Sequence, residues 1–198
     1  MPKYSLNLKP NYQRNPHWKK HKLGNKHRPE DSTIGKYGCL LSCYCDLATY
    51  ATGVQWTPPQ LDYLLCRKEG WGYDKGNQIV HSTLAYIFEE LIFHGLILCG
   101  HQPAPIPTID TMLPCVIKID FIPGGLVEPH WVLAKEKVRD DYIINDPWTG
   151  DERMLLQTYG KPGWDLARII LTVVRMDTNR KDSTQSPQRS AERAKEMI

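Results

Sequence analysis

The chain has 198 residues, of which 41% are hydrophobic and 24% are charged, as is ordinary for a globular protein with a full core. This composition excludes an intrinsically disordered chain, and no apolar run is long enough to predict a membrane-spanning helix. The first residues also lack the continuous apolar segment of a signal peptide, so we expect synthesis in the cytosol without an export signal.

Positive charge is concentrated at the N-terminus. Residues 1–29 contain eight Lys and Arg and no Asp or Glu, so this part carries +8 and the remainder of the +3 chain carries −5. A basic arm can contact nucleic acid or an anionic wall polymer, but no recognition-helix pattern or aromatic stacking motif accompanies it. We therefore expect residues 1–30 to be a solvated arm leading into the domain, and we expect no nucleic-acid partner.

Helical spacing of apolar residues dominates the next part of the chain. Spacings of three and four predict a helix over Cys39–Tyr50. A second helix is predicted to begin after Thr57, which caps it, with Gln60 completing a capping box. A third helix is expected within residues 78–93, closing at Gly95.

Short β-type segments replace this helical spacing after residue 107. They are separated by glycine, charged and Asp-Pro turns and read CVIKIDFI, HWVLAKEKV, DYIIND and ARIILTVVRM. Helices followed by strands indicate an α+β fold, with an N-terminal helical half packed on a C-terminal antiparallel β-sheet. We expect one domain over residues 31–176. Residues 177–198 are predicted to be a polar flexible tail that docks on a protein partner or stays free.

Six cysteines raise the question of disulfides or metal. The chain is long and core-forming, unlike small secreted disulfide scaffolds, so reduced thiols are expected. Three of the six fall within seven positions, at Cys39, Cys43 and Cys45, but their spacing is not that of a zinc site and no second compact pair follows. We expect neither a structural metal nor a cofactor.

Cys39 differs from its two neighbours in its place on the predicted helix. It lies in the first turn, where free N–H groups and the positive end of the helix dipole favour a thiolate. Gly38 before it leaves room for a substrate carbonyl to approach the sulfur. Cys43 and Cys45 lie deeper in the helix and are expected to be small buried hydrophobes. A helical cysteine is more often a packing residue than a nucleophile, so partners are needed.

His130 and Asp146 are the candidate partners in the sheet half. His130 begins a predicted strand, and Asp146 ends the next one, so a hairpin-like pairing brings the carboxylate within reach of the imidazole. The alternative interpretation of His130 is an ordinary histidine at a strand end, and that of Asp146 is a turn residue before proline. Because side chains alternate along a strand, Asp146 rather than Asn145 orients the imidazole if Tyr142 and Ile144 face the core helix.

Several segments together resemble a known family. They occur in a consistent order from Asn11 to Arg175 and read HWKKHKLGN, STIGKYGCLLS, TPPQLDYLL, EPHWVLA, YIINDPWTG and LLQTYG. The chain is similar to the cysteine peptidases related to the double-glycine leader peptidases of bacteriocin exporters, which are papain-like and occur in bacteria and in phage lytic proteins. The resemblance implies Cys39 as nucleophile, His130 as general base and acid, and Asp146 as the orienting residue.

One position departs from the papain-like pattern. Such enzymes have a glutamine shortly before the nucleophile that supplies an oxyanion donor, whereas this chain has Thr33 there and no glutamine between Arg14 and Gln55. A lost donor costs roughly a hundredfold or more in rate. Thr33 is therefore the candidate second donor beside the Cys39 backbone N–H. Trp131 and Trp148 are candidate groove residues, with core packing as the alternative.

The expected function is peptide-bond hydrolysis, with peptidoglycan stem peptides as substrate and a phage or bacterial enzyme that is released on lysis or carried in a virion. A leader-processing or protein-processing peptidase is the alternative within the enzyme class. From a different class comes a papain-like module that binds a peptide without cutting it and belongs to a larger assembly such as a virion. The threonine in place of glutamine is the feature that favours this last alternative.

Overall fold

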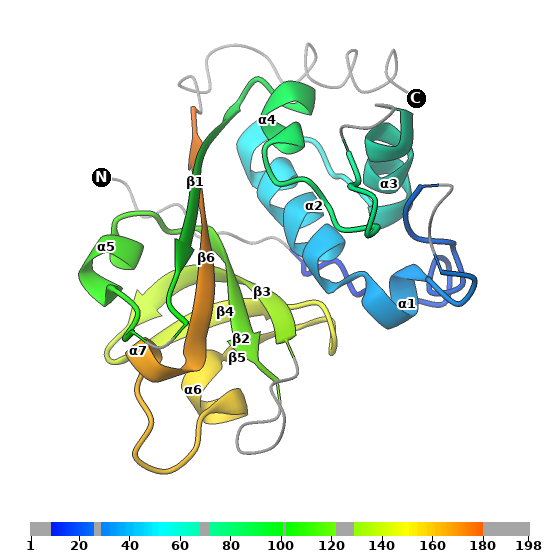
Figure 1. Ribbon diagram of the computed structural model, residues 1–198. Helices are drawn as coiled ribbons and strands as arrows, with labels where there is room; N and C mark the ends of the chain where they lie inside the picture. Colours follow the sequence, from blue (N-terminus) through cyan, green and yellow to red (C-terminus); the bar gives the residue numbers. More distant parts are fainter. Residues whose placement is uncertain (1–8, 26–28, 68–71, 101, 122–128, 180–198) are drawn as a thin grey trace.

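A computed structural model describes residues 9–25, 29–67, 72–100, 102–121 and 129–179 (Figure 1). The helices are α1 (Ile34–Tyr37), α2 (Cys39–Thr52), α3 (Pro58–Arg67), α4 (Thr83–Ile87), α5 (Ile106–Asp110), α6 (Leu155–Tyr159) and α7 (Leu166–Ile169). The strands are β1 (Leu91–Leu98), β2 (Cys115–Asp120), β3 (Pro129–Val138), β4 (Asp141–Asp146), β5 (Asp151–Met154) and β6 (Ile170–Thr178). The strands form one antiparallel sheet in the order β1-β6-β2-β3-β4-β5. The predicted α+β class with an antiparallel sheet is confirmed.

The first two predicted helices are present. Helix α2 begins at Cys39 and ends at Thr52, and the next residue, Gly53, adopts a left-handed conformation (φ 71°) that glycine tolerates without steric cost. Helix α3 begins after Thr57, whose backbone N–H donates to Oε1 of Gln60 at 3.0 Å. This contact is the side-chain half of the capping box that the sequence predicted.

The third predicted helix is wrong over most of its length. Only Thr83–Ile87 is helical, and Leu91–Leu98 forms the edge strand β1. Strand β1 pairs with β6, nearly eighty residues further along the chain, so its conformation is fixed by a distant partner and not by local spacing. The short polar strand β5 was not predicted either, because its sequence DERM has no apolar alternation.

Two hydrophobic clusters lie on opposite faces of the sheet (Figure 1). The first packs α2, α3 and α4 against inward-facing residues of β2, β3 and β6, namely Val116, Leu133 and Val174. The second packs α5, α6 and α7 against the alternate residues of the same strands, including Ile117, Val132 and Val173. Alternation along each strand therefore assigns neighbouring residues to different halves of the molecule.

The described part of the N-terminal segment packs into the domain. Asn11, Gln13 and Leu23 are 4%, 1% and 6% exposed. The backbone N–H of Gln13 donates to the carbonyl of Pro147, in the turn after β4, at 2.9 Å. Residues 9–25, called the strap below, therefore pack against the end of β4. They do not form the solvated arm that the charge alone predicted.

Two further expectations concern the C-terminal tail and membrane-spanning helices. Residues 177 and 178 of the predicted tail belong to β6, residue 179 follows the strand, and residues 180–198 lie outside the described residues. Within the part of the chain that the structure describes, no helix combines the length and apolar character needed to cross a bilayer.

Candidate active site

The three residues predicted to carry chemistry come from the ends of three elements. Cys39 is the first residue of α2, His130 the second of β3, and Asp146 the last of β4. Strands β3 and β4 are antiparallel neighbours, so the start of one lies beside the end of the other, and α2 packs on β3. Cys39 and His130 line the same cavity. The fold therefore brings the predicted set together.

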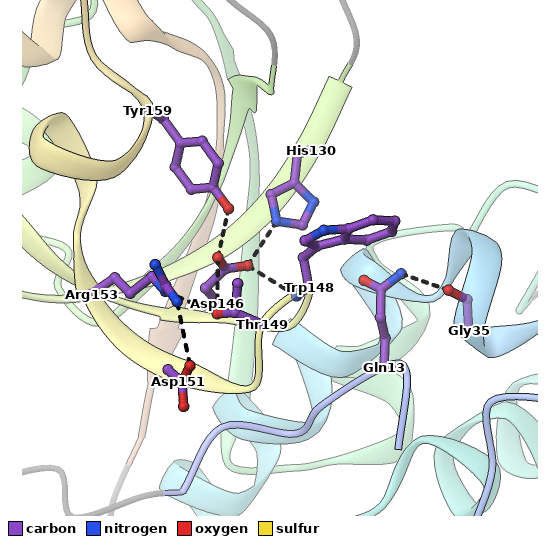
Figure 2. A network of polar contacts seen from close by, with 9 residues as sticks. All are labelled: Gln13, Gly35, His130, Asp146, Trp148, Thr149, Asp151, Arg153 and Tyr159. Atoms are coloured by element: carbon purple, nitrogen blue, oxygen red, sulfur yellow. Dashed lines mark hydrogen bonds and ion pairs between the residues drawn. The ribbon is translucent and has the colours of Figure 1, made fainter. Parts of the chain in front are cut away.

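Asp146 holds the imidazole of His130. Nε2 of His130 lies 3.0 Å from Oδ1 of Asp146 (Figure 2), and the two residues are 4% and 0% exposed. With Nε2 engaged, Nδ1 is the ring nitrogen left for the neighbouring Cys39 side chain, which acts to raise the pKa of His130. A thiol beside an imidazole that a carboxylate orients is the arrangement of an activated cysteine nucleophile.

The pKa of His130 is raised from its usual 6.5 to about 9. Burial is the largest single influence and acts to lower this pKa, because it disfavours the charged imidazolium. Hydrogen bonds to Asp146 and Cys39, together with the charges of those groups, outweigh burial. His130 is therefore a cation at neutral pH.

The carboxylate of Asp146 accepts four hydrogen bonds (Figure 2). Oδ1 accepts from His130 and from the backbone N–H of Trp148 at 2.9 Å. Oδ2 accepts from the hydroxyls of Tyr159 at 2.5 Å and Thr149 at 3.3 Å. Burial raises the pKa of Asp146, but bonding to His130, Tyr159 and the Trp148 N–H brings it below its usual value. Asp146 is thus held as an anion.

The face of β4 that carries Asp146 differs from the one assumed in the sequence argument. Tyr142 and Ile144 pack in the cluster with α5, α6 and α7, so they face away from α2. His130 emerges on that same face, and so Asp146 meets it there. Asn145 faces α2 instead. The choice of Asp146 over Asn145 as the partner of His130 matches the geometry. The premise behind that choice, that Tyr142 and Ile144 face the core helix, was wrong.

A cavity of about 650 Å³ adjoins Cys39 and His130. This volume is within the usual range of sites for small ligands. Trp131 and Trp148, the candidate groove residues, both line it. Phe121 packs edge-on against the rings of His130 and Trp148, at centroid distances of 5.0 and 5.5 Å. The imidazole is therefore fixed by an aromatic wall as well as by its carboxylate.

Gly38 has a different role from the one expected. It is not among the residues that line the cavity. A Cβ at this position would lie 2.4 Å from the carbonyl oxygen of Ile34, which accepts a hydrogen bond from the Gly38 N–H at 2.8 Å. Glycine is thus required for the close junction of α1 and α2, and it positions Cys39 rather than opening a path to the sulfur.

Gln13 is a site residue that the sequence argument missed. It lines the cavity with Cys39, His130 and Trp148, and Figure 2 shows its carboxamide beside the Trp148 indole. Nε2 donates to the carbonyl of Gly35 at 3.3 Å, while Oε1 is buried and has no hydrogen-bond partner among the described residues. A glutamine was expected only a few residues before Cys39, and Gln13 lies much further back, in the strap. The presence of this glutamine just before Arg14 was the one signal available in the sequence.

Thr33 lies at the N-cap position of α1 and is not among the residues lining the cavity. Its carbonyl accepts hydrogen bonds from the N–H groups of Lys36 and Tyr37, at 3.1 and 2.9 Å. Its side chain makes no capping hydrogen bond. Gln13, in contrast, lines the cavity together with Cys39 and His130, and Thr33 serves the start of α1.

A buried carboxylate joins the three parts that carry the site. Asp46, on α2, accepts from the backbone N–H and Nδ2 of Asn11 at 3.0 and 2.7 Å and from Nδ2 of Asn145 at 3.0 Å. Asn11 is two residues from Gln13, and Asn145 precedes Asp146. Burial raises the pKa of Asp46 to about 6, against the lowering effect of Asn145 and Asn11. The strap and β4 are thereby tied to the helix of Cys39.

The remaining cysteines are packing residues or lie apart from the cavity. All six are free thiols. Cys43 and Cys45 are 1% and 0% exposed, and burial raises the pKa of each thiol well above its usual value, as suits buried hydrophobes. Among the described residues, no group of three His, Cys, Asp or Glu side chains is arranged to hold a metal ion.

Comparisons of this chain with protein-family models, with curated proteins and with solved structures find no match.

Proposed function

We propose that this chain is a papain-like cysteine peptidase in which Cys39 is the nucleophile, His130 the general base and acid, and Asp146 the residue that orients the imidazole. The observation that carries the proposal is the shared cavity of Cys39 and His130, with His130 held cationic by a buried carboxylate. A thiolate and imidazolium pair beside a cavity of peptide size is the requirement for acyl transfer to sulfur.

In the proposed reaction, the two ring nitrogens of His130 have separate roles: Nε2 binds Asp146, and Nδ1 exchanges protons with the reacting groups. The Cys39 thiolate attacks the peptide carbonyl carbon, and the tetrahedral adduct collapses to a thioester as the imidazolium gives its proton to the leaving amine. The neutral imidazole then takes a proton from water, whose oxygen attacks the thioester, and the adduct collapses to the carboxylic acid and the Cys39 thiolate beside the imidazolium. Asp146 keeps Nε2 engaged throughout, so Nδ1 always faces the reacting atoms.

The oxyanion of the tetrahedral adduct needs donors that exist before the reaction. The backbone N–H of Cys39 is in the first turn of α2, where N–H groups lack helical partners. Nε2 of Gln13 carries two hydrogens, and among the described residues it makes one contact, to the carbonyl of Gly35. We assign these two groups to the oxyanion hole. Gln13 thus supplies the carboxamide that was counted as missing because Thr33 stands in place of a glutamine. That missing group was the feature that favoured a module that binds a peptide without cutting it.

Peptidoglycan stem peptides are the proposed substrate, cleaved by an enzyme of phage or bacterial origin. Support for this part comes from the resemblance of the HWKKHKLGN, EPHWVLA and YIINDPWTG segments to enzymes of lytic proteins. The cavity volume also suits a short peptide rather than a folded protein surface.

Digestion of purified sacculi tests the substrate. Soluble peptides analysed by mass spectrometry are expected to show one new amine and one new carboxyl terminus per cut, with none released by Cys39→Ala. Cys66→Ala is the matched control, since Cys66 is the other half-buried thiol and does not line the cavity. Intact stems together with cleavage of an unfolded protein would overturn the wall substrate and favour a processing peptidase. Cleavage by Cys39→Ala would overturn the nucleophile.

A further inference from the structure

Asn11, near the start of the strap, uses each of its three N–H hydrogens in a buried hydrogen bond. Its backbone N–H and its Nδ2 donate to Oδ1 of Asp46 at 3.0 and 2.7 Å, and Nδ2 also donates to the carbonyl of Trp56 at 3.2 Å. Asn11 is 4% exposed, so water competes little for these bonds. The strap is therefore pinned to α2 and to the segment that follows it.

Asp46 lies on the same helix as the proposed nucleophile. It follows Cys39 by seven residues within α2, which is two helical turns, so the two residues lie on one side of the helix, about 10 Å apart along its axis. Burying a carboxylate costs free energy, and the bonds from Asn11 and Asn145 offset part of that cost. Because an α-helix is stiff, a group bound to Asp46 has a fixed place relative to Cys39.

Gln13 is two residues further along the strap and has few contacts of its own. Its Nε2 donates to the carbonyl of Gly35 at 3.3 Å, which is longer than usual, and its backbone N–H donates to Pro147. After Gln13 the strap is held by backbone bonds, such as that from the N–H of Gly35 to the carbonyl of Lys19. Before Gln13, the hydrogen bonds that join the described strap to the rest of the domain are those of Asn11.

We propose that Asn11 and Asp46 are positioning residues that hold the carboxamide of Gln13 at the oxyanion hole, although neither lines the cavity. This inference rests on the proposed function and goes beyond it by assigning the residues that control the side-chain oxyanion donor. Displacement of a catalytic group by about 1 Å can cost on the order of 10²-fold in rate. Asn11 thus acts on the reaction through Gln13 and not through Cys39 or His130.

Asn11→Ala tests this role, because it removes the two side-chain bonds and keeps the backbone donor to Asp46. The probes are a synthetic peptidoglycan stem pentapeptide and unfolded casein. We expect kcat to fall about 10-fold while KM stays within about twofold, because the donor acts on the transition state. The rate of Cys39 alkylation by iodoacetamide should not change, since the thiol and the imidazole keep their places.

The combination of Asn11→Ala with Gln13→Ala separates a positioning role from a merely structural one. If Asn11 acts through Gln13, then Asn11→Ala should change kcat by less than about twofold once Gln13 is already alanine. Tyr142→Phe is the matched control, because it removes another long-range hydrogen bond, that of the Tyr142 hydroxyl to Asp110 at 2.6 Å, outside the cavity. It should leave kcat unchanged, and urea unfolding shows that each variant is folded.

The outcomes distinguish this inference from the proposed function. Multiplicative losses of kcat in the double variant, or an equal loss in Tyr142→Phe, would overturn the inference and leave the peptidase in place. If the parent cleaves neither probe, the proposed function fails, and amide hydrogen exchange then reports on the position of Gln13. Faster exchange of the Gln13 N–H in Asn11→Ala, but not in Tyr142→Phe, would support the positioning role, and an unchanged rate would overturn it.

Discussion

Asn145 and Asp146 are consecutive residues of β4 whose side chains leave the sheet on opposite faces and hold different parts of the site. Asp146 lies 3.0 Å from Nε2 of His130, whereas Nδ2 of Asn145 donates to Asp46 of α2 at 3.0 Å. One position therefore sets the charge of the imidazole, and its neighbour ties the strand to the helix that carries Cys39. Substitutions at the two positions are expected to have separable effects.

Asp146→Asn is expected to lower the pKa of His130 from about 9 by roughly one pH unit or more, because a neutral amide no longer stabilises the imidazolium against burial. The titration of the imidazole signals by NMR measures this directly. Turnover of a peptide substrate is expected to fall on the order of 10²-fold or more, because the ring loses its fixed orientation.

Asn145→Ala is the matched control for that experiment. It removes the donor to Asp46 and is expected to cost about 1–3 kcal/mol of unfolding free energy, while the pKa of His130 stays near 9. If Asn145→Ala lowered the pKa of His130 as much as Asp146→Asn does, the separation of the two faces would be refuted.

Gln13→Ala is expected to reduce kcat about 10²-fold with little change in KM, because the lost donor acts on the oxyanion of the transition state. The rate of Cys39 alkylation should be unaffected, since within the described residues Gln13 makes no hydrogen bond to His130. Thr33→Ala tests the position that the sequence suggested and should leave kcat within about twofold. The opposite ranking of the two variants would return the oxyanion role to Thr33.

Asp46 gives the protein a distinctive dependence of stability on pH. Its pKa is raised from 3.8 to about 6, so between these values the folded state binds more protons than the unfolded state and stability falls as pH rises. Compared with Asp46→Asn, the parent is expected to lose about 3 kcal/mol of unfolding free energy between about pH 3.5 and pH 7. Urea unfolding of both proteins across this range measures the difference, and a pH-independent difference would contradict the raised pKa.

Tyr159→Phe removes one of the bonds that lower the pKa of Asp146. A lowered carboxyl pKa contributes stability above the unfolded value of about 4, and this contribution is lost as pH falls through the folded value. The variant is therefore expected to be about 1–3 kcal/mol less stable than the parent at pH 7, with a smaller deficit at pH 3. Chemical denaturation at the two pH values checks this, and an equal deficit at both would indicate lost packing alone.

Local patterns predicted α2, α3 and most of the sheet because spacing, caps and alternation act over a few residues. Period two placed Asp146 and Asn145 on different faces, but it did not say which face meets α2, since that depends on how the helical half docks. Strand β1 was missed because its partner β6 is far away in sequence. Gln13 was missed for the same reason, since its place is set by contacts with Gly35 and Pro147.

Activation of Cys39 by His130 is tested most directly by the rate of alkylation of each cysteine by iodoacetamide at pH 6, quantified by peptide mass spectrometry. Cys66 is the internal reference, because it is likewise half-buried but is not among the residues that line the cavity with His130. We expect Cys39 to react at least about 10-fold faster than Cys66, and His130→Ala to abolish this advantage while the protein stays folded. Equal rates for the two thiols, or a Cys39 rate that His130→Ala leaves unchanged, would contradict it.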